Sequence, residues 1–93
     1  MEEDCLVWIV EVAEEWLKQN KPGQWEIAAF ESDNIIRLKW WEKHKQPRVI
    51  YSRAFSGIQI ENTVNPSIIV AVGMEIAMNP KAEKLEEFHG LKP

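Results

Sequence analysis

The fold that the sequence predicts depends on one stretch, Ile35-Ile36-Arg37-Leu38-Lys39-Trp40-Trp41. From Ile36 onward, its apolar residues alternate with residues that can face solvent. Successive side chains of a β-strand point to opposite faces of the sheet, so the alternation indicates a strand. Ile36, Leu38 and Trp40 are expected to face a core. The side chains expected to face outward are Arg37, Lys39 and Trp41.

Two further strands are predicted on either side of this stretch. Gln24–Phe30 and Arg48–Phe55 alternate and contain aromatic and β-branched residues, which favours strands. A polar turn at Glu31–Asn34 and a hairpin loop at Glu42–Pro47 connect them to the central strand. After a bend, Ile58–Ile60 is expected to form a short fourth strand. The prediction is an antiparallel sheet of three or four strands.

Helices are predicted before and after the sheet. In Glu3–Gln19, apolar residues recur at spacings of three and four, as on one face of a helix. Pro66–Met78 begins with an Asn65 cap and a proline at the first helical position, although its β-branched start would also suit a buried strand. Asn79-Pro80 repeats the start signal and predicts a short helix through Phe88. The core-facing residues expected on the first helix are Leu6, Ile9, Val10, Ala13, Trp16 and Leu17.

These elements predict a two-layer α+β fold of the order α-β-β-β-α with a short terminal helix, since helices on one face of an antiparallel sheet form such a core. The 93 residues fit a single domain, 1–93, with residues 89–93 expected to be frayed. No stretch approaches the roughly 20 apolar residues of a membrane span, and the acidic start, Met1–Asp4, lacks the positive charge of a signal peptide. The expected location is the cytoplasm, without membrane contact.

The composition offers few groups for catalysis. Cys5 is the only cysteine, so one chain can form no internal disulfide and no multi-cysteine metal site. His44 and His89 lie far apart without metal-ligand spacing, and the four glycines are too scattered for a phosphate-binding loop. We expect a protein with no catalytic residues, no metal and no cofactor.

Charge is distributed unevenly along the chain. Residues 1–36 hold nine acids and two lysines, whereas residues 37–53 hold six Lys or Arg residues and one acid, Glu42. The formal net charge is −4. If Ile50 and Ala54 face the core, the third strand adds Tyr51 and Arg53 to the outward face of the central strand. The residues predicted to bind a partner are Arg37, Lys39, Trp41, Lys43, Lys45, Arg48, Tyr51 and Arg53.

This face favours a non-enzymatic binding or regulatory module that acts by stoichiometric contact with a partner protein. Residues 68–78 are apolar almost all round their helix, and Val7, Trp8 and Val12 widen the stripe of the first helix. Part of this surface is expected to meet a second subunit, so a homodimer is predicted. The alternative is that the two helices pack on each other.

Nucleic acid is the alternative partner, because the hairpin 37–53 places cations, which meet phosphates, beside rings, which stack on bases. The sequence pI of about 5.2 is low for such a role. The element order is similar to that of double-stranded RNA-binding domains, whose final helix starts with phosphate-binding lysines. Pro66–Val70 carries no basic residue at that place.

A metal-dependent nuclease is the remaining alternative. A helix followed by three strands resembles the start of the restriction-type nuclease core, which implies an acid and then an acid-x-Lys pair on the next strand. Asp33 and Glu42 are the matching acids, but Lys43 follows Glu42 directly, so the spacing departs from the motif. Without that pair, a catalytic metal has no assembled site.

Overall fold

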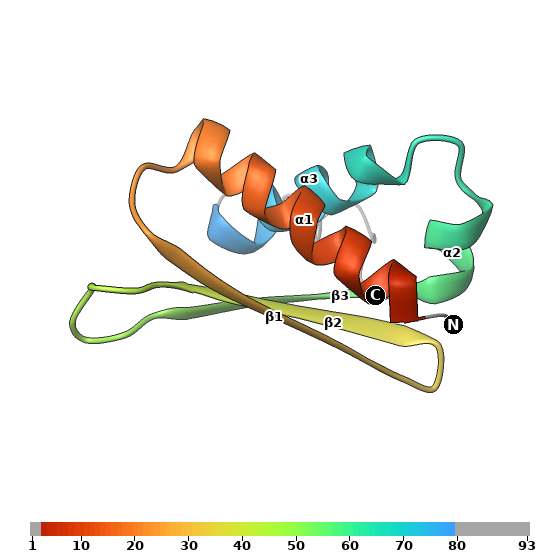
Figure 1. The fold of residues 1–93 in the computed structure, drawn as a ribbon, viewed down its shortest axis with the longest axis horizontal. Helices are drawn as coiled ribbons and strands as arrows, with labels where there is room; N and C mark the ends of the chain where they lie inside the picture. The colour runs from red at the N-terminus through yellow and green to blue at the C-terminus, as the bar shows by residue number, and fades with distance from the viewer. Residues whose placement is uncertain (1–2, 80–93) are drawn as a thin grey trace.

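The computed structural model describes residues 3–79, which form a sheet and a layer of helices. The strands pair antiparallel in the order β1-β2-β3, and the helices lie over one face of the sheet (Figure 1). The predicted two-layer α+β fold is confirmed. In chain order the elements are α1 (Glu3–Asn20), β1 (Trp25–Ser32), β2 (Ile35–Glu42), β3 (Ile50–Ser56), α2 (Gly57–Asn62) and α3 (Pro66–Met78).

The central strand β2 supplies the middle of the core. Ile36, Leu38 and Trp40 are fully buried, as their alternation predicts. The indole Nε1 of Trp40 donates a hydrogen bond to the Sδ of Met78 at 3.3 Å, so the polar edge of this buried ring has a partner. The helix residues buried in the same cluster are Ile9, Ala13 and Leu17 of α1, Ile60 of α2, and Val70 and Met74 of α3.

A two-residue turn, Asp33-Asn34, connects β1 to β2. Its residues have φ angles of 52° and 64°, in the left-handed region that Asp and Asn tolerate better than most residues. Ser32 and Ile35 pair directly across the turn, so the turn sets the register of the two strands. The turn predicted within residues 31–34 is confirmed, and β1 runs two residues past its predicted end.

The segment after β3 is a helix, and the prediction of a fourth strand at Ile58–Ile60 is wrong. Ser56 ends β3 and caps α2, because its Oγ accepts a hydrogen bond from the backbone N–H of Gln59 at 3.2 Å. The backbone N–H of Gly57 donates to the carbonyl of Asn34 at 2.8 Å. Since the capping hydroxyl satisfies a free N–H of the first turn, the chain turns into a helix directly after the strand.

α3 spans Pro66–Met78, the predicted bounds, so the strand alternative for residues 68–72 is wrong. Pro66 stands in the first turn, where its missing N–H breaks no helical hydrogen bond. The helix predicted through Phe88 and the fraying predicted at 89–93 lie outside the described residues. Between residues 3 and 79, no helix combines the length and the apolar character needed to cross a membrane.

Candidate binding surfaces

The side chains of β3 face the opposite way from the prediction. The register of β2 and β3 sets Tyr51 opposite Trp40 and Arg53 opposite Leu38. Residues directly opposite each other share a face of the sheet, so Tyr51 and Arg53 lie on the side that the helices cover. The Tyr51 ring stacks on the Trp40 ring, with centroids 6.0 Å apart and planes at 22°. Neither residue belongs to an outward docking face.

The register in which β3 pairs with β2 explains this error. Residues 42–49 separate the paired Trp41 and Ile50, and this even number of residues places even positions of β2 and odd positions of β3 on the same face. Ile50 and Ala54 were the assumed core residues of β3. The side chain that fills the core is Phe55, which is 6% exposed. The large aromatic residue at an odd position, Phe55, was the feature of the sequence that indicated which face of β3 points to the core.

We call the side of the sheet away from the helices the outer sheet face; no described helix covers it (Figure 1). Phe30, Ile35 and Ile50 are 47%, 43% and 56% exposed on it, beside the outward Arg37 and Lys39. Apolar and cationic side chains therefore lie side by side on an open surface. Its residues are Glu26, Ala28, Phe30, Ser32, Ile35, Arg37, Lys39, Trp41, Ile50, Ser52, Ala54 and Ser56.

The aromatic rings of the outer sheet face are in contact with cations. The Nζ of Lys39 lies 5.6 Å from the centroid of the Phe30 ring, and the guanidinium carbon of Arg48 lies 5.7 Å from that of Trp41. The Nε1 of Trp41 donates to the Oε1 of Glu26 at 3.3 Å. These contacts hold Trp41 against the sheet and place charge over each ring.

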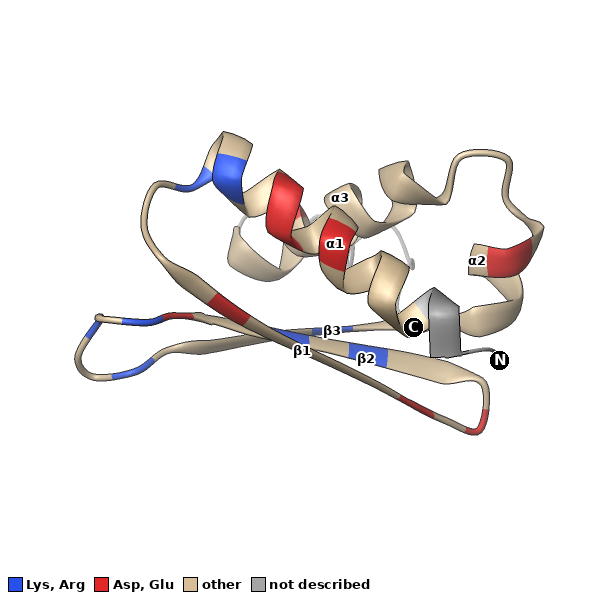
Figure 2. Cartoon of the chain, in the orientation of Figure 1, with Lys and Arg blue, Asp and Glu red and all other residues tan. Residues whose placement is uncertain are grey.

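The basic loop, residues 43–48, extends from one end of the sheet beyond the helices (Figures 1 and 2). All six residues are exposed. The base of the loop is attached to the start of β1, because the N–H of Lys43 donates to the carbonyl of Gln24 at 2.7 Å and the Nε2 of His44 lies 3.0 Å from the Oε1 of Gln24. The cations of the loop therefore continue the positive charge of the outer sheet face from an anchored position.

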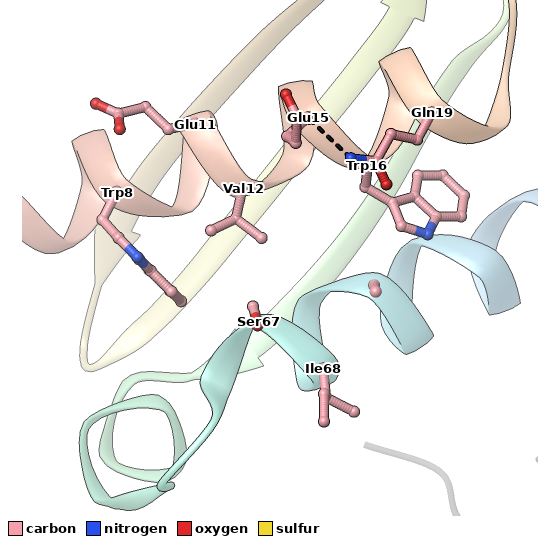
Figure 3. Close-up of a pocket in the computed structure, with 9 residues that line it drawn as sticks. Trp8, Glu11, Val12, Glu15, Trp16, Gln19, Ser67 and Ile68 are labelled. Carbon is pink, nitrogen blue, oxygen red and sulfur yellow. Dashed lines mark hydrogen bonds between the residues drawn. The ribbon is translucent and has the colours of Figure 1, made fainter.

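A second surface lies in the helix layer. An open groove of about 470 Å³ separates parts of α1 and α3, a volume within the range of about 300–1,000 Å³ that ligand sites occupy (Figure 3). Glu11, Glu15 and Gln19 stand along its α1 side, and the Nε2 of Gln19 donates to the Oε1 of Glu15 at 2.7 Å. Its apolar walls are formed by Trp8, Val12 and Trp16 of α1 and by Ile68 and Ala71 of α3.

One feature of the sequence, the wide apolar stripe of α1, indicated a surface of this kind. Trp8 and Val12 widen the apolar stripe of α1 beyond the face that a sheet covers, and both line the groove. Trp16, predicted on the core face, is half-buried and lines the groove as well. α1 and α3 pack against each other, as the alternative reading of the apolar helices predicts, yet no described residue covers the groove.

Within residues 3–79, no group of three or more His, Cys, Asp or Glu side chains is placed to hold a metal ion. Comparison of the chain with protein-family models, curated proteins and solved structures gives no match. The outer sheet face and the groove are the candidate binding surfaces of the described residues.

Proposed function

We propose that this protein is a non-enzymatic regulatory module that acts by stoichiometric contact with a partner protein, and that it does so as a homodimer. The observation that carries the proposal is the outer sheet face, where Phe30, Ile35 and Ile50 are exposed on paired strands next to cations. Burial of apolar surface favours association, and the regular strands hold these side chains in place before a partner arrives.

The partner presents an acidic surface. The cations of the outer sheet face and of the basic loop surround the apolar side chains, and negative charge on the partner would steer the encounter. Lys39 lies over Phe30 and Arg48 over Trp41, so less ring surface is open for stacking on bases. The position of Tyr51 under the helices removes a further ring from the face. These contacts favour a protein over nucleic acid.

The size of the face supports a dimer. Three strands of about eight residues have a flat outline of roughly 370 Å² at about 3.3 Å per residue and 4.8 Å per strand, which is small beside a standard interface, where each partner buries roughly 800 Å² of accessible surface. β3 is an edge strand whose second side pairs with no described strand. Antiparallel pairing of β3 with β3 of a second copy around a two-fold axis would double the outer sheet face.

Charge reversal on the outer sheet face tests partner contact. The double variant Arg37→Glu, Lys39→Glu is expected to lose at least tenfold in capture of the partner from lysate of the source cells, because it places negative charge against an acidic surface. The matched control is Lys18→Glu, Lys21→Glu, which changes the net charge equally on α1 and its following turn. Quantitative mass spectrometry of the captured protein, with and without nuclease treatment, measures the effect.

Equal loss in both double variants would contradict the proposal, since net charge rather than the outer sheet face would then control capture. The same experiment has a separate outcome that would favour nucleic acid as the partner. If nuclease abolishes capture, and labelled single-stranded oligonucleotides bind with an affinity that falls steeply with salt, nucleic acid replaces protein as the partner.

A lysine on the edge strand tests the dimer. Ser52→Lys is expected to shift the mass in light scattering from twice 10.9 kDa toward 10.9 kDa, because exposed lysines on an edge strand oppose strand pairing. Ser32→Lys is the matched control, since Ser32 is also exposed and lies on the other edge strand, β1. A wild-type protein that is monomeric across the micromolar range, or a dimer that Ser32→Lys disrupts equally, would refute pairing through β3.

A further inference from the structure

We infer that the groove between α1 and α3 is a second docking site, which accepts an amphipathic helix of a partner protein with basic residues on the flank next to α1. The site lies in the helix layer, whereas the outer sheet face lies on the uncovered side of the sheet (Figures 1 and 3). The inference therefore goes beyond the proposed function and can fail independently of it.

The spacing of the groove residues suits a helix. Trp8, Val12 and Trp16 recur every four residues and form one ridge on α1, about 12 Å long at 1.5 Å per residue. Ile68 and Ala71 form the facing ridge on α3, and Ile68 is 58% exposed. A third helix laid between two ridges buries side chains at spacings of three and four residues, and about two of its turns would fit between Trp8 and Trp16.

The openness of the groove favours a helix over a small molecule. Small-molecule sites usually bury about 70–90% of their ligand and direct a few polar groups at it. This groove is open to solvent, and several of its polar side chains bond to nearby residues: Gln19 donates to Glu15, and the Ser67 hydroxyl donates to the Oδ1 of Asn65, the residue before α3, at 2.6 Å. What the groove offers is apolar contact along its length.

The charged residues beside the groove determine which residues the partner helix would carry along one flank. The charged residues that line the groove are Glu11 and Glu15, both exposed on α1, and Glu75 is the one charged residue of α3. Lysine or arginine along one flank of the partner helix would meet these carboxylates. The helix layer of a second copy would bring its own carboxylates against those beside the groove, and the like charges would repel. The basic loop of a second copy brings positive charge, but its tip, residues 43–48, offers only Pro47 to fill an apolar groove.

Synthetic peptides test the inference directly. The probe is a labelled 18-residue peptide with leucines at i, i+3, i+4 and i+7 and lysines on both flanks. The first comparison peptide is a scramble of equal composition without the stripe, and the second carries glutamate in place of each lysine. In fluorescence anisotropy with the full chain, the striped lysine peptide is expected to bind at least tenfold more tightly than either comparison peptide.

Two isoleucines give a matched pair of variants. Ile68 and Ile58 are both 58% exposed, but Ile68 lines the groove whereas Ile58 lies on α2 outside it. Ile68→Ser is expected to weaken binding of the striped lysine peptide about tenfold, and Ile58→Ser to leave it unchanged. Glu11→Gln with Glu15→Gln should weaken binding and flatten its salt dependence, because the charge contribution is lost while the apolar walls remain.

Three outcomes would overturn the inference. The first is that the striped lysine peptide does not bind at millimolar concentration. The second is that Ile68→Ser and Ile58→Ser weaken it equally, or that the glutamate peptide binds as tightly. The third is that Ile68→Ser, rather than Ser52→Lys, converts a dimer to a monomer in light scattering, which would make a second copy the occupant. The variant Arg37→Glu, Lys39→Glu should bind the peptide normally, so a failed outer sheet face leaves this test intact.

Discussion

Trp40→Ala is expected to lower the free energy of unfolding by about 3–5 kcal/mol, since removal of a fully buried aromatic side chain typically has this effect. The substitution removes the stacking partner of Tyr51 and the donor to Met78, and it leaves a cavity in the middle of the core. A domain of this size has about 5–14 kcal/mol in total. In urea denaturation followed by circular dichroism, the variant should be marginally folded, and in thermal denaturation its Tm should be at least about 12 °C lower.

The neighbouring tryptophan is the control. Trp41 points to the outer sheet face, where it contacts Arg48 and Glu26 and is only half-buried. Trp41→Ala should therefore cost about 1 kcal/mol, in line with the loss of a partly exposed ring contact. Equal losses for the two variants would show that the alternation of β2 does not separate core from surface.

Gly73→Val is expected to lower the free energy of unfolding by about 3 kcal/mol, at the upper end of over-packing effects. A Cβ at Gly73 would lie 2.6 Å from the Cε1 and 2.8 Å from the Cζ of Phe55, and 3.2 Å from the Cγ of Arg53. Contacts between carbon atoms are favourable at about 3.5–4.0 Å, so the buried Phe55 ring would have to move. Thermal and urea denaturation measure the loss.

Gly73→Ala separates this explanation from helix propensity. Alanine is favoured over glycine within a helix by about 1 kcal/mol, so propensity alone predicts a more stable protein. The overlap with Phe55 predicts a less stable one. Phe55→Leu in the Gly73→Ala background should recover part of the loss, because residues in contact do not contribute additively. A stabilised Gly73→Ala variant would show that α3 moves away from β3 at little cost.

The sequence predicts an element well where local signals and the core agree. α3 has its predicted bounds because Asn65-Pro66 marks a start that the β-branched run alone does not. The central strand is predicted residue by residue, since alternate side chains of β2 are buried. α2 is missed because a capping contact of Ser56 ends the strand, and such a contact depends on the backbone path rather than on composition.

The outer sheet face was predicted only in part, because the facing of β3 depends on pairing between strands. Arg37, Lys39 and Trp41 point outward as predicted, whereas Tyr51 and Arg53 do not. The alternation within one strand shows which residues share a face, but it does not show which of the two faces lies on the same side of the sheet as a given face of the neighbouring strand. The register in which the two strands pair decides this. The groove depends on the relative placement of two helices, which periodicity within each helix does not determine.

The central strand places buried and exposed side chains at alternate residues of one short segment. Ile36, Leu38 and Trp40 of β2 are enclosed and strongly constrained in size, while its odd positions lie on the outer sheet face, where a change of charge or shape disturbs the core less. Selection can therefore change the charge and shape of the outer sheet face without repacking the interior, provided that substitutions fall on every second residue. The same property makes the domain a suitable scaffold for library design, with randomised codons confined to the odd positions of β2 and the even positions of its neighbours.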